Sequence, residues 1–116
     1  YLIRDGLRES LKALDLNLLV TKDSYASPTV TSFIPHDKDE LTYIKSTLKS
    51  RFNITIAGGQ GKLKGTILRI GHMGKVSPFD ILSVVSALEI ILTDYRKVNY
   101  IGKATLKFTE VIQHDA

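Results

Sequence analysis

Residues 58–74 read GGQGKLKGTILRIGHMG, and the rest of the fold can be worked out from this stretch outward. Its middle part, residues 66–70 (TILRI), is rich in β-branched and apolar side chains and predicts a strand. Residues 53–57 (NITIA), ahead of the glycines, alternate in polarity and predict a second strand. Two strands that flank a glycine-rich turn predict an antiparallel pair.

A helix is predicted on each side of this strand pair. Upstream, Asp37 is a suitable N-cap, and Glu40, three residues later, completes the spacing of a capping box. The apolar face that follows consists of Leu41, Ile44, Leu48 and Phe52. Downstream, Ser77 is a good N-cap, while Pro78 and Asp80 suit the first turn of a helix. The apolar stripe of this second helix consists of Phe79, Leu82, Val85, Leu88, Leu92 and Tyr95.

The remaining segments complete an α+β pattern. Residues 3–15 carry apolar side chains at helical spacing and predict a helix. Residues 16–20 and 29–34 read as strands on either side of a polar loop. Residues 103–113 fit either a helix or a strand, and we favour the helix. We therefore predict one domain of 116 residues with a small, mostly antiparallel sheet and helices packed on one face of it.

The composition excludes several classes of protein. The chain has no cysteine, so disulfides and cysteine-ligated metals are excluded and a cytoplasmic location is favoured. No apolar run approaches the roughly 20 residues that span a bilayer, and the first residues do not resemble a signal peptide. Because the sequence has no initial methionine, we expect it to be part of a longer protein.

The net charge of +4 is unevenly distributed, because no Asp or Glu lies between residues 41 and 79. This stretch contains Lys45, Lys49, Arg51, Lys62, Lys64, Arg69 and Lys75. Such a run suits an anionic partner, whether nucleic acid, a phosphate or a carboxylate substrate, but it is also typical of a solvated surface. Tyr43 and Phe52 fall at core positions rather than among the lysines, so no stacking platform for bases is predicted.

Three familiar kinds of site are not predicted. The glycine-rich run lacks the spacing of a Walker loop, and Lys64 stands where a dinucleotide-binding motif needs its third glycine, so a plain turn is favoured. His36, His72 and His114 do not share a helical face at the spacing of metal ligands, and no metal site is expected. No pair of nucleophile and base stands out, so the chain is not predicted to be an enzyme by itself.

Arg69 is the best single candidate for a functional residue. It lies in a predicted strand between apolar neighbours, and a buried guanidinium group needs a partner. A carboxylate is the natural partner, because the guanidinium fork binds it through two parallel hydrogen bonds. The pattern alone leaves two other interpretations open, an internal salt bridge and an arginine on an exposed face.

Residues 58–74 resemble a motif of the class V aminotransferases, in particular the serine–pyruvate and alanine–glyoxylate subgroup. The continuation from Lys75 to Leu82 is also similar to that family, with its polar residue, proline and acidic residue ahead of a long helix. Upstream, the similarity extends through residues 6–20 and 27–31. The resemblance covers about residues 2–95, whereas the tail from Lys97 onward departs from the family pattern.

The resemblance implies the small C-terminal domain of a fold type I enzyme that depends on pyridoxal 5'-phosphate (PLP). In the family, the arginine at the position of Arg69 binds the α-carboxylate of the substrate, and Gly71 and Gly74 would let the backbone turn beside the site. His72 and Met73 would support the packing there. The Schiff-base lysine and the other cofactor ligands belong to a large domain outside this chain, so the lysines at positions 62, 64 and 75 are not expected to bind PLP.

The resemblance also implies an activity and its partners. The intact enzyme would transfer an amino group from a small amino acid, alanine or serine, to a 2-oxo acid such as glyoxylate or pyruvate. It would be a homodimer that binds neither nucleic acid nor membrane, and this chain alone would be inactive. Two alternatives remain: a related PLP-dependent lyase, desulfurase or soluble hydrogenase subunit, and a free-standing basic module that binds anions or nucleic acid.

Overall fold

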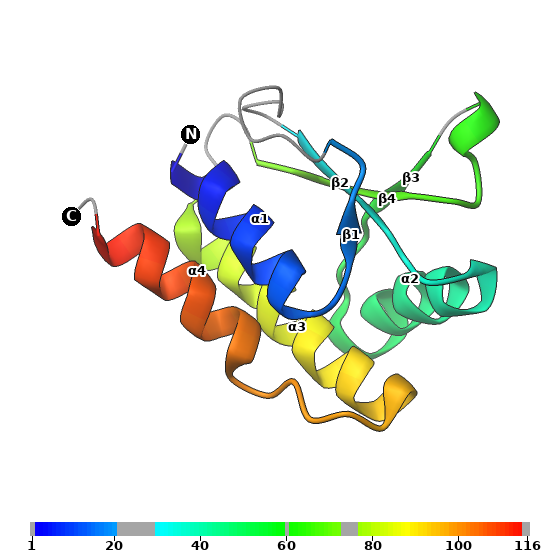
Figure 1. Cartoon of the computed structure of the whole chain (residues 1–116). Coiled ribbons are helices and arrows are strands. Elements are labelled where there is room, and N and C mark those ends of the chain that lie inside the picture. The colour runs from blue at the N-terminus through cyan, green and yellow to red at the C-terminus, as the bar shows by residue number, and fades with distance from the viewer. Residues whose placement is uncertain (1, 21–29, 60, 73–76, 115–116) are drawn as a thin grey trace.

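The computed structural model describes residues 2–114 apart from 21–29, 60 and 73–76 (Figure 1). The whole of the loop predicted between the first two strands, residues 21–28, lies outside the described residues. The described elements are α1 (Leu2–Ala13), β1 (Asn17–Leu18), β2 (Val30–Ile34), α2 (Lys38–Phe52), β3 (Ala57–Gly58), the 3₁₀ turn η2 (Gly61–Leu63), β4 (Leu68–Gly71), α3 (Pro78–Arg96) and α4 (Lys103–His114). No helix within these residues has the length and apolarity needed to cross a membrane.

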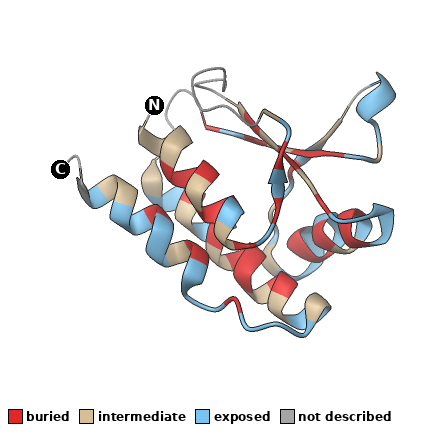
Figure 2. Cartoon of the chain, viewed as in Figure 1, coloured by how far each residue is buried: buried red, intermediate tan, exposed pale blue. Residues whose placement is uncertain are grey.

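The four strands form an antiparallel sheet in the order β1-β2-β4-β3, and the helices pack beneath it (Figure 1). Phe33 in β2 pairs with Leu68 in β4, and both side chains are fully buried. Burial alternates along both strands, as expected of a sheet with one covered face (Figure 2). The predicted α+β fold is therefore confirmed.

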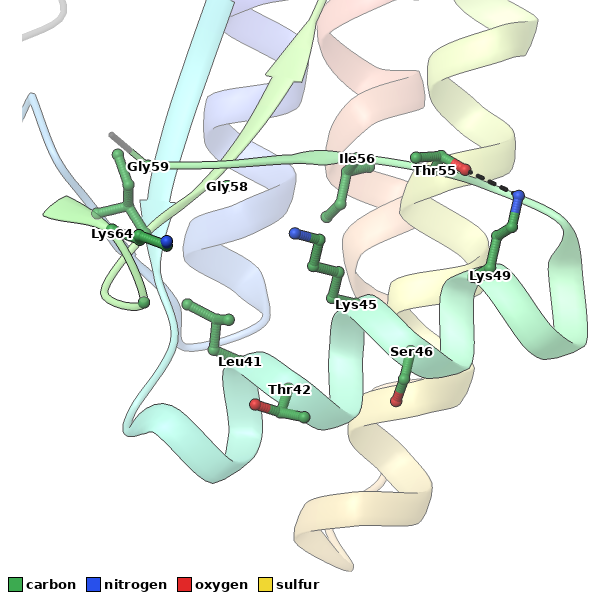
Figure 3. Close-up of a pocket in the computed structure, with 12 residues that line it drawn as sticks. Leu41, Thr42, Lys45, Ser46, Lys49, Thr55, Ile56, Gly58, Gly59 and Lys64 are labelled. Atoms are coloured by element: carbon green, nitrogen blue, oxygen red, sulfur yellow. Dashed lines mark hydrogen bonds between the residues drawn. The ribbon is translucent and has the colours of Figure 1, made fainter. Parts of the chain in front are cut away.

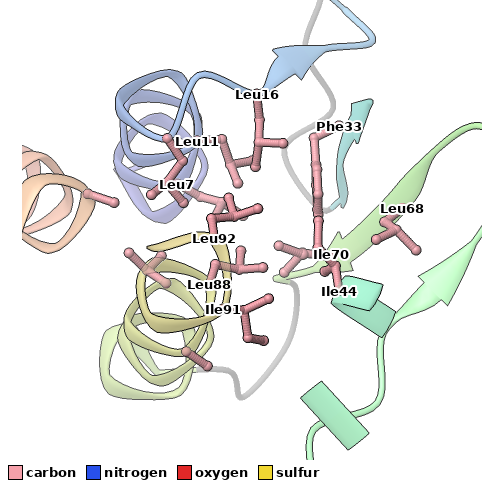
Figure 4. Close-up of a cluster of buried hydrophobic side chains, with 14 of the residues drawn as sticks. Leu7, Leu11, Leu16, Phe33, Ile44, Leu68, Ile70, Leu88, Ile91 and Leu92 are labelled. Atoms are coloured by element: carbon pink, nitrogen blue, oxygen red, sulfur yellow. The ribbon is translucent and has the colours of Figure 1, made fainter. Parts of the chain in front are cut away.

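One hydrophobic core lies between the sheet and the helices (Figure 4). Its members include Leu7 and Leu11 from α1 and Leu88 and Leu92 from α3. The predicted stripe on α3 is partly wrong, because Phe79 is 77% exposed. Steps of three residues fall about 60° short of a full helical turn, so a stripe that begins at Phe79 drifts away from the face that meets the core.

The predicted strand over residues 53–57 is also wrong for most of its length. Asn53 adopts the left-handed conformation, with φ of 55°, and ends α2. The backbone N–H of Asn53 donates to Lys49 O (3.2 Å) and that of Ile54 donates to Leu48 O (2.9 Å). These bonds satisfy the last carbonyl groups of the helix, so only Ala57 and Gly58 remain to pair with β4.

The helix starts confirm the predicted caps, with one difference. The Asp37 carboxylate accepts a hydrogen bond from the backbone N–H of Glu40 (2.8 Å), as predicted. The Glu40 carboxylate, however, accepts from the backbone N–H of His36 (2.8 Å) instead of completing the box with Asp37. At the start of α3, Ser77 and Asp80 form the full reciprocal box.

A buried ion pair explains why Glu40 departs from the capping pattern. The Arg96 guanidinium donates through Nε to Glu40 Oε1 (2.6 Å) and through Nη2 to Oε2 (2.8 Å). The two side chains are 8% and 2% exposed, respectively. Arg96 Nη1 also donates to the Tyr100 hydroxyl (3.2 Å), which in turn donates to Asp15 (3.1 Å). The pair therefore joins α2 to the end of α3 and to the loop after α1.

The tail of the chain is part of the fold. Residues 103–113 are helical, as favoured from the sequence, and α4 packs against both α1 and α3. Phe108 lies against Gly6 so closely that a Cβ added to this glycine would be 3.0 Å from the ring. The Glu89 carboxylate of α3 accepts the backbone N–H of Thr105 (2.7 Å), which satisfies a donor in the first turn of α4.

Gly59 provides a test of the turn between β3 and β4. A Cβ on this residue would lie 2.3 Å from Leu63 O and 2.8 Å from Ile67 Cγ1. We expect Gly59→Ala to lower the free energy of unfolding by about 1–3 kcal/mol, because backbone and a buried side chain would have to move. Chemical denaturation measures this change.

The neighbouring glycine supplies the control for this experiment. A Cβ on Gly58 would meet only Lys45 Nζ, at 3.6 Å, which is ordinary contact. Gly58→Ala should therefore leave the stability within about 0.5 kcal/mol of the wild type. Equal stability of the two variants would contradict the close approach at Gly59.

Candidate active-site arginine

Arg69 lies on the face of the sheet that the helices do not cover. Its neighbours in β4, Leu68 and Ile70, are buried beneath the sheet, whereas Arg69 is half-buried and points to the other side. Ser32 in β2 and Ala57 in β3 are its partners across the two adjacent strands. The sequence left open whether the Arg69 side chain is buried or exposed. In the structure it is half-buried.

The guanidinium group is held by the backbone of the neighbouring strand. Arg69 Nε donates a hydrogen bond to Gly58 O (2.8 Å). Within the described residues, no carboxylate lies within 4.0 Å of the Arg69 side chain, so they supply no internal salt bridge for it. The hydrogen bond fixes the orientation of the group and leaves its two terminal nitrogens with no acceptor in the described part of the chain. A planar pair of donors of this kind fits a carboxylate.

A groove of about 440 Å³ adjoins Arg69 at the edge of the sheet. Ala57, Arg69 and Gly71 line one side of it, and Asp80 and Val84 from α3 line the other. The Asp80 carboxylate accepts from Ser77 N (3.0 Å) as part of the helix cap and does not form an ion pair with Arg69. The groove is thus large enough for a small organic acid next to the guanidinium group.

The other residues assigned to the site from the resemblance have mixed outcomes. Gly71 ends β4 without positive φ, and a Cβ added to it would meet nothing within 4 Å, so its supporting role stays a prediction. Gly74 and Met73 lie outside the described residues. His72 is buried, and its Nε2 shares a hydrogen bond with Thr31 Oγ1 (2.8 Å), which fits the packing role expected of it.

The other two histidines, His36 and His114, lie in segments that do not line the groove beside Arg69. His36 forms a hydrogen bond through Nε2 with Asp15 O (2.9 Å), next to the cap of α2. His114 is the last residue of α4. Among the described residues, no group of three or more His, Asp or Glu side chains could hold a metal ion.

The basic stretch divides between different surfaces. Arg51 pairs with Asp94 of α3 (3.1 Å), and Lys75 is outside the described residues. Lys45, Lys49 and Lys64 line a second groove that Arg69 does not enter (Figure 3). The sequence indicated the excess of positive charge, but it did not show which lysines lie together.

The chain is similar to known proteins in both sequence and structure. No family model matches the chain. The chain is 28% identical over 112 residues to the pyridoxamine–pyruvate transaminase of Mesorhizobium japonicum, which is 96% of this chain and 28% of that protein. The crystal structure of pyridoxamine–pyruvate aminotransferase from Mesorhizobium loti matches with a TM-score of 0.89 and 28% identity, over 99% of this chain and 30% of the other. The chain is homologous to a C-terminal fragment of the class V aminotransferases.

A further relative of this chain carries a different name. The soluble hydrogenase small subunit of Synechococcus is 47% identical over 98 residues, which is 84% of this chain and 25% of that protein. The chain therefore spans about a quarter of the length of the curated relatives it matches. The structural match also includes the tail after Lys97, so the departure expected there from the sequence is wrong at the level of the fold.

Proposed function

We propose that this chain is the C-terminal small domain of a PLP-dependent aminotransferase, with Arg69 as the anchor for the substrate carboxylate. The main support for the proposal is the environment of the Arg69 guanidinium group. It is oriented by Gly58 O, lies beside a groove and has no carboxylate partner in the described part of the chain. The homology to aminotransferases, whose substrates are amino acids and 2-oxo acids, supports a carboxylate as the missing partner.

In this proposal, the chain binds and orients the substrate, while the rest of the intact protein holds the cofactor. Among the described residues, no lysine lines the groove beside Arg69, so none of them there fits the role of a Schiff-base residue. When bound, PLP supplies the electron sink for the amino-group transfer. Arg69 fixes one end of the amino acid, and Gly71 leaves open space beside it, so the amino group is presented in one orientation. The chain alone would be inactive.

The substrates that we propose are alanine or serine as the amino donor and pyruvate or glyoxylate as the acceptor. The name of the Mesorhizobium relative includes pyruvate, which supports the acceptor class. A homodimer in the cytoplasm is proposed from the resemblance to the family and from the lack of cysteine in the sequence.

The name of the Synechococcus relative favours one other function, that of a hydrogenase subunit. Iron–sulfur clusters are held by cysteine thiolates, and this chain contributes none. The homology to aminotransferases and the position of Arg69 therefore support the transaminase more directly.

The proposal is tested by comparing alanine with ethylamine, which lacks the carboxylate, as amino donors for the intact protein in its PLP form. We expect alanine to convert the cofactor, as followed by its absorbance, and ethylamine to need a concentration at least about thirtyfold higher. Conversion by both amines at similar concentrations would contradict a carboxylate anchor. Failure of every amino acid and amine tested would contradict the aminotransferase function itself.

A further inference from the structure

A second groove, of about 670 Å³, lies between α2 and the segment that runs from β3 through the turn to β4 (Figure 3). Its volume falls in the range of small-molecule sites. The floor is apolar, since Leu41, Ile56 and Ile67 line it and are at most 9% exposed. The groove therefore offers a place for the apolar body of a ligand.

Three lysines surround this floor. Lys45 and Lys49 are four residues apart and lie on the same face of α2, and Lys64 comes from the turn on the other side (Figure 3). The Lys45 ammonium reaches across to β3, where it lies 3.6 Å from the position of a Cβ on Gly58. The Lys49 ammonium donates to the Thr55 hydroxyl (3.4 Å). Positive charge thus reaches the groove from both of its walls.

No acidic group of the described chain neutralises these lysines. None of the described residues that line the groove is Asp or Glu. The ion pairs of the described residues do not include Lys45, Lys49 or Lys64. In contrast, Arg51, on the same helix, is paired with Asp94. The three charges therefore repel one another unless an anion lies between them.

The type of basic side chain in the groove indicates which type of anion it binds. A carboxylate is bound best by the planar fork of arginine, and no arginine among the described residues lines this groove. Lysines bind phosphate as point charges, and a phosphate group offers three strong acceptor oxygens that several ammonium groups can share. No aromatic side chain in the described part of the chain lines the groove either, so these residues provide no platform for the stacking of nucleic-acid bases.

We propose that this groove binds a small phosphate monoester, with the phosphate between Lys45 and Lys64 and the apolar part of the ligand on the floor of Leu41, Ile56 and Ile67. The site is distinct from the carboxylate anchor, because Arg69 does not line it. It stands whether or not the intact protein is an aminotransferase.

Phenyl phosphate is a suitable probe, and its binding can be followed through the backbone amide signals of the 116-residue chain in heteronuclear NMR spectra. We expect the signals of Gly58, Gly59 and Gly65 to shift in a saturable way. The double variant Lys45→Gln/Lys64→Gln should weaken binding at least about tenfold, because both walls lose their charge. The matched control Lys38→Gln/Lys107→Gln removes the same charge from exposed positions outside the groove and should change the affinity less than about twofold.

Each component of the proposal can fail separately. Equal losses in the two double variants would mean that net charge alone attracts the ligand, which would overturn the site. Inorganic phosphate that binds as tightly as phenyl phosphate would overturn the role of the apolar floor. A short oligonucleotide that binds more tightly than phenyl phosphate through the same lysines would overturn the small-ligand assignment. Since all four lysines are exposed, the variants should keep the wild-type melting temperature.

Discussion

Arg69→Ala should raise the concentration of alanine needed to convert the PLP form of the intact protein by about thirtyfold or more. The variant loses the two terminal guanidinium nitrogens that have no acceptor in the described part of the chain. Loss of one partner of a buried, hydrogen-bonded charge pair costs about 2–5 kcal/mol, which corresponds to this change in affinity. An absorbance titration with alanine measures it, and the bound cofactor should remain.

Two further variants make this result specific. Arg69→Lys keeps the charge but loses the fork, so it should fall between the wild type and Arg69→Ala. Arg51→Ala removes an exposed arginine from α2 and should titrate like the wild type. The assignment of Arg69 would be wrong if Arg69→Ala bound alanine normally, and the role of the guanidinium fork would be wrong if Arg69→Lys did so.

Glu40→Gln should lower the free energy of unfolding by about 3–5 kcal/mol, the usual cost of leaving one member of a buried ion pair without its partner. The change keeps the shape of the side chain but removes the charge that faces Arg96. Arg96 would then be left in a site where its side chain is only 8% exposed. Urea denaturation at neutral pH measures the difference.

Asp94→Asn is the matched control, because it removes a carboxylate from another ion pair between α2 and α3. Arg51 and Asp94 are about half exposed, so their pair should contribute no more than about 1 kcal/mol. Similar losses in the two variants would contradict the special role of Glu40.

The effect of Glu40 should also depend on pH. Burial opposes ionisation of this carboxyl, but the hydrogen bonds from Arg96 and from the His36 backbone, together with the charges of Arg96 and His36, outweigh it, so the pKa of Glu40 lies below its ordinary value of 4.5. A lowered pKa in the native state means that the unfolded chain takes up the proton first as the pH falls. The stabilisation is therefore complete above about pH 4.5 and disappears as the pH falls through the native pKa, where wild type and Glu40→Gln should converge.

Local signals in the sequence were enough for most of the fold. Ser77 was predicted to cap α3 and Asp80 to lie in its first turn, because both signals fall within one turn of the helix start. The strand expected at residues 53–57 was wrong because alternation in polarity does not show that Asn53 can take the left-handed conformation and end the preceding helix. A competition between a helix cap and a strand is decided by contacts that a short window of sequence does not contain.

Long-range partners were beyond the sequence. Glu40 and Arg96 are 56 positions apart, so nothing near Glu40 indicated that its carboxylate would serve an ion pair rather than the cap. Arg69 was singled out by its apolar neighbours, but only the pairing of β4 with β2 and β3 places it on the uncovered face of the sheet. Likewise, the run without acidic residues indicated positive charge, whereas the groove of Lys45 and Lys64 depends on how α2 packs on the turn.

The contact of α4 with α1 has a consequence for how this chain folds during synthesis. Phe108 packs on Gly6, so α1 is covered in part by a helix that is synthesised after the sheet, α2 and α3. The apolar side of α1 that faces α4 must wait, uncovered by that helix, while the intervening residues are translated. The sheet and α2 can assemble earlier during translation. The layer of α1, α3 and α4 closes only after this segment has been translated, and the entropy cost of closing a long loop then arises in a single step.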